Sequence, residues 1–272
     1  MSLGVYNGVL TGMQNGAYAG TDIGVASGTA TEFFDADIPR RNLLSYIDMG
    51  NRAVYPINST GLLGRDLTTS TAGLTLVAPF TFEYLNKGCI RFPGTSTSQR
   101  LSTAFTTTIV GGPTSNFTFG GWFQVARMDG TKEGNFFNRG RDGSGLGWSL
   151  LVGTDANGFF RVGSVTSSPT PVGNVFTTTV QAALNTWYHI LGIHENGVGL
   201  SIYVNGVFIG FQSFTGTSLR TSGIGWAWGA NSANPGSQFD GRAAITYAWE
   251  RILSPNEIMQ VFLAHKQRFL KP

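Results

Sequence analysis

Side chains suited to catalysis are few in this sequence, and their spacing is wrong for the common mechanisms. The chain holds 15 Asp and Glu, three His and one Cys among 272 residues. No strand-like stretch carries carboxylates in the E-x-D-x-x-E alternation that lets an acid and a nucleophile face one sugar. The G-x-S-x-G, H-E-x-x-H and P-loop motifs do not occur either. These observations predict that the chain is not an enzyme.

Histidine and cysteine do not form a metal site by their spacing. His189 and His194 lie five residues apart in one predicted strand, so their side chains should point to opposite faces. We expect partly buried, hydrogen-bonded histidines rather than shared metal ligands. The single cysteine, Cys89, excludes an intramolecular disulfide, and its alternating neighbours predict a small buried side chain. No cofactor is expected.

Two tryptophans are the residues best suited to contact a ligand. Trp226 and Trp228 flank Ala227 and therefore share one face of a predicted strand. Packing in the core is the first interpretation of such a pair. If exposed, the two rings could stack on a saccharide, which makes them the candidate glycan-binding residues.

The first 30 residues carry a repeat of four. Glycine stands at seven successive positions with this spacing: Gly4, Gly8, Gly12, Gly16, Gly20, Gly24 and Gly28. Each glycine costs a water-exposed helix about 1 kcal/mol relative to alanine, whereas a spacing of four keeps all of them on one face of an extended chain. We therefore expect residues 1–36 to form an extended arm that is ordered only against a partner. A flexible leader and a membrane helix of small residues are the alternatives.

An all-β body is expected from residue 37 to residue 272. Glycine contributes 38 residues, aromatics 12% and charged residues only 12%, which is typical of short strands joined by tight turns. No helical pattern of useful length precedes residue 254, so the sheets should be antiparallel. The expected strands are 43–49, 89–92, 117–126, 148–152, 159–165, 187–194, 199–204, 207–214, 223–226 and 241–248.

Local signals place two turns and one helix. Asn205-Gly206 lies between two apolar runs and predicts a hairpin. Asp240-Gly241 is expected to be a second turn with a positive φ. Ser254 and Glu257 form a capping-box pattern around Pro255, which predicts the start of a C-terminal helix that docks on the sandwich.

Several segments along residues 42–269 together resemble laminin-G-like and concanavalin A-like domains. They are Phe117–Phe123, Asn185–His189, Leu200–Gly206, Ile224-Gly225, Phe239–Ile245 and Arg251–Ile258. Three further segments are similar to the form of this domain found in structural proteins of tailed bacteriophages: Asp48–Pro56, Ile90–Gly94 and Ala264–Phe269.

The resemblance implies a two-sheet antiparallel jelly-roll sandwich in a non-enzymatic virion protein, as a capsid decoration, head fibre or tail component. The arm would bind other capsid or tail proteins and copies of itself. An oligomer is expected, and viral symmetry alone suggests a trimer. The alternative is a lectin-like carbohydrate-binding module for host-surface glycans.

The sequence also bears on three further classes of partner: metal ions, nucleic acid and membranes. Laminin-G-like domains often hold calcium in rim loops, so the resemblance makes Asp129, Asp142 and Asp155 candidate ligands, although their spacing identifies no site. The net charge is +3, and the lysines and arginines are scattered, which argues against nucleic acid. No apolar run approaches the ~20 residues that span a bilayer.

Overall fold

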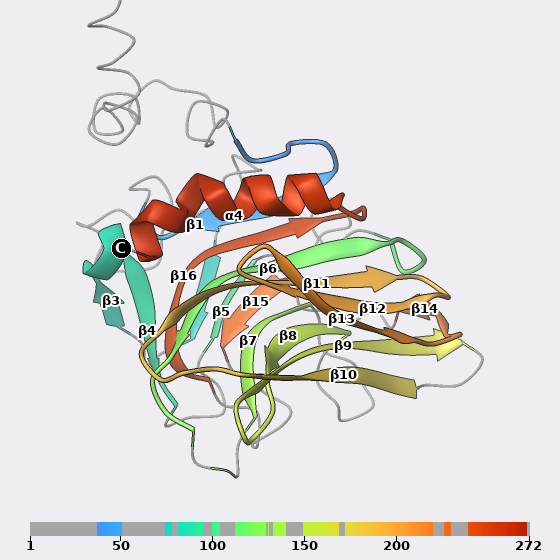
Figure 1. The fold of residues 1–272 in the computed structure, drawn as a ribbon, viewed down its shortest axis with the longest axis horizontal. Coiled ribbons are helices and arrows are strands. Elements are labelled where there is room, and N and C mark those ends of the chain that lie inside the picture. The colour runs from blue at the N-terminus through green and yellow to red at the C-terminus, as the bar shows by residue number, and fades with distance from the viewer. Residues whose placement is uncertain are drawn as a thin grey trace, which may run out of the picture.

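Two antiparallel β-sheets packed face to face form the body, with one long helix on the outside (Figure 1). The computed structural model describes residues 37–50, 74–77, 81–94, 100–103, 112–128, 130, 133–139, 149–168, 172–219, 226–229 and 239–270. The predicted all-β sandwich with a C-terminal helix is confirmed. The predicted arm, residues 1–36, lies outside the described residues, so its boundary with the body stays a prediction.

The first sheet carries the helix on its outer face. Its strands run in the order β13 (Val207–Ser213), β12 (Gly199–Val204), β11 (Trp187–Glu195), β6 (Phe117–Val125), β16 (Asp240–Trp249), β4 (Cys89–Pro93) and β3 (Thr81–Glu83), and β1 (Leu43–Asp48) also pairs with β16. The short 3-10 helix η2 (Leu85–Lys87) joins β3 to β4. Strands β13 and β3 are therefore at opposite edges of this sheet.

The second sheet covers the inner face of the first. Its order is β10 (Val172–Gln181), β9 (Phe159–Ser168), β8 (Leu150–Thr154), β7 (Gly134–Arg139), β15 (Trp226–Gly229), β5 (Arg100–Thr103) and β2 (Leu74–Val77), and β14 (Thr217–Leu219) pairs with β9. Every strand pair is antiparallel. This pattern follows from the absence of crossover helices.

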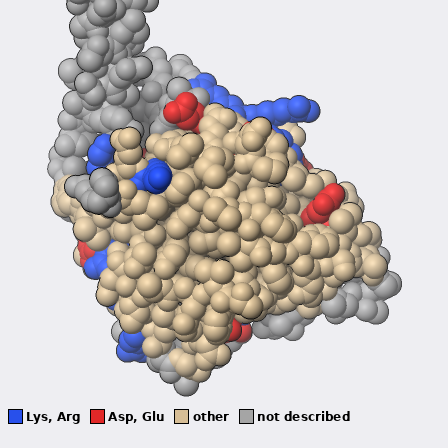
Figure 2. All heavy atoms as spheres, viewed as in Figure 1, with Lys and Arg blue, Asp and Glu red and all other residues tan. Residues whose placement is uncertain are grey.

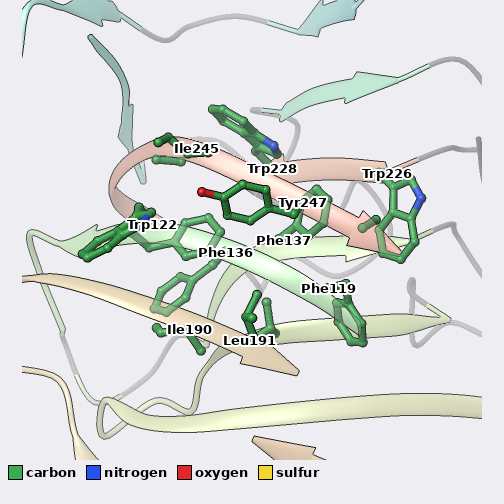
Figure 3. Close-up of a cluster of buried hydrophobic side chains, with 14 of the residues drawn as sticks. Phe119, Trp122, Phe136, Phe137, Ile190, Leu191, Trp226, Trp228, Ile245 and Tyr247 are labelled. Atoms are coloured by element: carbon green, nitrogen blue, oxygen red, sulfur yellow. The ribbon is translucent and has the colours of Figure 1, made fainter. Parts of the chain in front are cut away.

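Aromatic side chains from both sheets fill the space between them (Figure 3). Phe119 of β6 lies 5.7 Å from Trp226 of β15, and Phe123 stacks on Phe136 at 5.1 Å between ring centroids. The indole Nε1 of Trp228 donates a hydrogen bond to Thr246 Oγ1 on the facing sheet. Burial of large rings, with one polar contact satisfied across the core, stabilises the pairing of the two sheets.

Glycine pair Gly120-Gly121 allows the central strand β6 to sit between its neighbours. A Cβ atom on Gly120 would lie 2.0 Å from the Ile190 carbonyl oxygen, and one on Gly121 would lie 1.9 Å from that of Ile245. Gly120 also has a φ of 147°, which side chains with a Cβ atom rarely adopt. These positions therefore require glycine if β11 and β16 are both to pair with β6.

The C-terminal helix α4 (Pro255–Phe269) begins as predicted. Ser254 and Glu257 form the complete capping box, and Pro255 occupies the first turn. Phe262 and Phe269 stack on Trp122 of β6 at 5.7 and 4.5 Å, which docks the helix on the outer face of the first sheet. Among the described helices, none is long and apolar enough to cross a membrane.

The predicted strand 223–226 overlaps β15 at Trp226, and its residues 223–225 lie outside the described residues. Strands β2, β3, β5, β7, β10 and β14 were not expected from the sequence. The predicted hairpin at Asn205-Gly206 is confirmed, with φ of 51° and 80° at the two residues. The turn predicted at Asp240-Gly241 is wrong, because both residues belong to β16 and pair with Pro93 and Phe92 of β4.

Candidate functional site

The two tryptophans proposed as a glycan platform are core residues. Trp226 and Trp228 are both 0% exposed, and Trp226 stacks on Phe137 at 5.1 Å. They do share one face of β15, as predicted, but this face points toward the first sheet, where Trp228 bonds Thr246. Neither ring is open to a ligand, so their assignment to sugar binding is corrected to core packing.

The two histidines of β11 point to opposite faces, as predicted. His189 packs beside Trp122 and Phe262 on the outer face, and His194 packs against Phe117 and Phe214 between the sheets. The expectation of partly buried, hydrogen-bonded rings is wrong. Both are 0% exposed, and no described residue bonds any of the four ring nitrogens.

Burial makes both histidines hard to protonate. It lowers the pKa of His189 to about 3, with a further contribution from the nearby His265. It lowers the pKa of His194 to about 3 as well, with a smaller contribution from Arg139. A neutral imidazole in an apolar interior has no access to substrate, so these residues are structural.

Five acidic side chains in the described part of the chain are held by arginines. The ion pairs are Asp48–Arg268, Glu83–Arg242, Glu133–Arg161, Asp240–Arg91 and Glu257–Arg251. Each pair uses a different arginine, and the pairs of Glu83 and Asp240 are neighbours because Arg91 lies opposite Arg242. Glycoside hydrolysis requires two carboxyl groups that flank one bond, whereas each of these acids is engaged by its own arginine.

Of the three candidate calcium ligands, Asp155 is described by the structure, whereas Asp129 and Asp142 lie outside the described residues. The Asp155 carboxylate accepts hydrogen bonds from the amides of Asn157 and Phe159 at 2.9 Å and thereby closes the turn between β8 and β9. Among the described residues, no three His, Cys, Asp or Glu side chains lie close enough together to hold a metal ion. Calcium binding stays a prediction.

Cys89 is buried, as predicted from its alternating neighbours. Burial raises the pKa of its thiol to about 12, and nearby Glu83 adds to this shift. Because the thiolate is the reactive form, Cys89 is an inert core residue.

The described surface at the β13 edge carries few charged side chains. From Val162 to Leu219, a stretch that includes β10 to β14, Glu195 is the one charged residue. The face on which these strands lie in Figure 1 is almost entirely free of charged side chains in Figure 2. Charged residues normally cover the edge of a sheet, so an uncharged edge requires an explanation.

Three aromatic residues stand on this edge, and we refer to them as the aromatic strip: Tyr203, Phe208 and Phe211. Phe208 is 52% exposed and Phe211 is 47% exposed, whereas Tyr203 is half-buried beneath them. The rings of Tyr203 and Phe208 meet edge to face at 5.4 Å. Exposed aromatic rings of this kind are common in binding surfaces, because they offer apolar area at low entropic cost.

A β-bulge puts all three rings on the same face. Ile202 pairs with Gly210 and Tyr203 pairs with Phe208, so Ile209 is an extra residue in β13. Phe208 and Phe211 lie three positions apart, so in a regular strand they would point to opposite faces, and the bulge at Ile209 puts them on the same face. Leu191, two residues from His189 in β11, pairs with Tyr203, so the aromatic strip lies on the outer face.

Two glycines beside the strip let aromatic rings pack directly against the backbone of the sheet. A Cβ atom on Gly199 would lie 2.4 Å from the Phe211 ring, so this ring rests directly on the backbone of β12. A Cβ atom on Gly210 would lie 2.5 Å from Phe176 of β10, which packs beneath β13 from the other sheet. The strip is therefore supported from both sides and preorganised for contact with a ligand.

Sequence reasoning did not identify the aromatic strip. The segment Val207–Phe211 is an apolar run next to the hairpin turn, and such a run is normally assigned to the core. The one sequence signal was the absence of charge between Val162 and Leu219, which shows that this region cannot present an ordinary solvated edge.

Comparisons with known proteins identify the fold. Residues 94–259 match the family model described as the concanavalin A-like lectin/glucanases superfamily. No curated protein sequence shows significant similarity to this chain.

Three solved structures illustrate the similarity. The binding domain of Paraclostridial Mosquitocidal Protein 1 has a TM-score of 0.61 at 15% identity over 81% of this chain and 52% of its own length. The binding domain of botulinum neurotoxin DC, solved with rat synaptotagmin II, gives 0.62 at 12% identity over 82% and 52%. Trypanosoma rangeli sialidase with the inhibitor DANA gives 0.59 at 15% identity over 83% and 33%. The chain thus spans about half of each toxin domain and a third of the sialidase, and the likeness is one of fold.

Proposed function

Since the chain belongs to the concanavalin A-like lectin/glucanase superfamily, we propose that it is a non-enzymatic carbohydrate-binding sandwich displayed on a virus particle. In this proposal the aromatic strip contacts the glycan and residues 1–36 attach the chain to the particle. One observation carries the binding role: three preorganised rings are presented on an edge almost free of charge. Such a surface suits the apolar face and hydroxyl rim of a sugar.

The chemistry of the rest of the described surface supports binding over hydrolysis. The paired acids are engaged with arginines, and the buried histidines cannot reach a substrate. The toxin structures that share the fold are named as binding domains, which is consistent with a binding role here. Fold alone does not determine function, so the proposal depends on the aromatic strip.

Attachment to a virion is supported by the sequence. The seven-glycine repeat has a strict spacing that a plain linker does not need,. The resemblance to bacteriophage structural proteins indicates which class of protein the arm would bind. The partners would be capsid or tail proteins and other copies of this chain. Several sandwiches on one particle would raise the effective affinity of weak glycan contacts.

Two experiments test the two parts of the proposal separately. Purified chain applied to an array of immobilised glycans should show saturable binding to a restricted set of them. Absence of binding to any glycan at micromolar protein would refute the carbohydrate role. Chain lacking residues 1–36 should lose co-sedimentation with particles assembled without it, and unchanged co-sedimentation would refute the attachment role.

A further inference from the structure

We infer that the aromatic strip selects uncharged saccharides and discriminates against acidic ones. This inference rests on the proposed carbohydrate-binding function and names the ligand class of the same site. It follows from the position and the sign of Glu195, the one charged residue between Val162 and Leu219.

Glu195 lies beside the aromatic strip on the outer face. It ends β11 and pairs with Gly199 of β12, the residue on which the Phe211 ring rests. Ser201, two positions along β12, pairs with Phe211. Residues directly opposite in a sheet share a face, so the Glu195 carboxylate belongs to the same surface as Phe211.

No lysine or arginine in the described part of the chain forms an ion pair with this carboxylate. Between Val162 and Leu219 the sequence holds no lysine or arginine, and the described arginines that pair with acids belong to other parts of the sandwich. Sialic acids, uronic acids and sulfated sugars carry a negative charge, which proteins usually recognise with arginine or lysine. Such a sugar would meet the Glu195 carboxylate beside the Phe211 ring.

Uncharged polar groups remain for hydrogen bonding around the rings. On the face of the rings, Ser201 is half-buried and Ser213 of β13, which pairs with Gly199, is exposed. Hydroxyl groups donate and accept, so they match the hydroxyl groups of a neutral sugar while the rings cover its apolar face. The surface therefore favours a neutral oligosaccharide over its acidic derivative.

The test compares matched pairs of glycans on one array: each neutral oligosaccharide and its sialylated or sulfated derivative. Wild-type chain should bind the neutral member of each pair more tightly. Glu195→Lys should shift the ratio of acidic to neutral binding by about tenfold at low ionic strength, and added salt should reduce this shift. Glu195→Gln, which removes the charge without reversing it, should give an intermediate ratio.

The outcomes separate this inference from the function on which it rests. Preferential binding of acidic members by wild type would overturn the inference and leave carbohydrate binding intact, and so would an unchanged ratio in Glu195→Lys. Binding to no glycan would refute both. Concentration-dependent self-association that Phe208→Ala abolishes, without glycan binding, would assign the strip to a second copy of the chain and overturn the inference.

Discussion

Removing the Phe208 ring should separate binding from stability. Phe208 is about half exposed at 52%, so Phe208→Ala should cost only about 1 kcal/mol of the free energy of unfolding, against the 1.5–3 kcal/mol of a fully buried apolar side chain. The ring contributes to binding together with Tyr203, 5.4 Å away. Loss of an aromatic hot-spot residue typically costs about 2 kcal/mol of binding, which corresponds to about a 30-fold higher Kd.

Isothermal titration with a neutral oligosaccharide would measure this Kd, and urea unfolding would measure stability. Tyr84→Ala is the matched control, because Tyr84 is also exposed, at 66%, and meets Phe82 edge to face at 5.2 Å. It lies beyond β3 at the opposite edge of the same sheet. We expect Tyr84→Ala to leave the Kd unchanged within twofold. Equal loss of affinity in both variants, or unchanged affinity in Phe208→Ala, would refute the assignment of the site.

Three further predictions concern the interior. Trp228→Ala should destabilise the fold by about 3–5 kcal/mol, because it empties a fully buried site; a loss below 1 kcal/mol in urea unfolding would contradict its core role. Burial holds the pKa values of His189 and His194 well below that of histidine in the unfolded chain, so the stability they allow is complete above pH 6.5 and is lost as pH falls. Each histidine should lower the free energy of unfolding by about 2 kcal/mol at pH 5. His194→Phe should therefore remove about half of this pH-dependent loss, and an unchanged pH profile of stability would contradict the prediction. Arg268→Gln should cost about 2 kcal/mol, because it removes the charged hydrogen bond to half-buried Asp48, which then keeps only the Gly50 amide as a partner among the described residues, and a thermal melt that matches wild type would count against this pair.

The sequence predicted the architecture because its strongest signals are local. Asn205-Gly206 requires positive φ at both positions, and the structure has it. Ser254 and Glu257 cap the helix through contacts within one turn. Such signals depend on neighbouring residues alone, so no knowledge of the rest of the fold is needed to interpret them.

Strands in which buried and exposed side chains do not alternate regularly were not predicted from the sequence. Strand β7 has the sequence GNFFNR, and a bulge between Asn135 and Phe137 interrupts its register. Strand β10 is rich in threonine and carries both exposed and buried positions at irregular intervals. Periodicity of two identifies a strand only when one whole face is buried.

Which aromatic residues are exposed could not be predicted from the sequence. Alternation correctly put Trp226 and Trp228 on one face, but the direction of that face depends on the packing of the two sheets. Phe208 and Phe211 share a face only because Ile209 is bulged out of register. A bulge and an edge position are properties of strand pairing between distant segments, and no local pattern reports them.

The most direct test of the carbohydrate-binding site is an NMR titration of isotopically labelled chain with a neutral oligosaccharide that binds on the array. We predict that backbone amide shifts will change mainly between Ser201 and Ser213 and near Glu195, and that the same titration with Phe208→Ala will leave them almost unchanged. Shift changes centred on the opposite edge, around Glu83 and Tyr84, would contradict the assignment of the aromatic strip as the binding site.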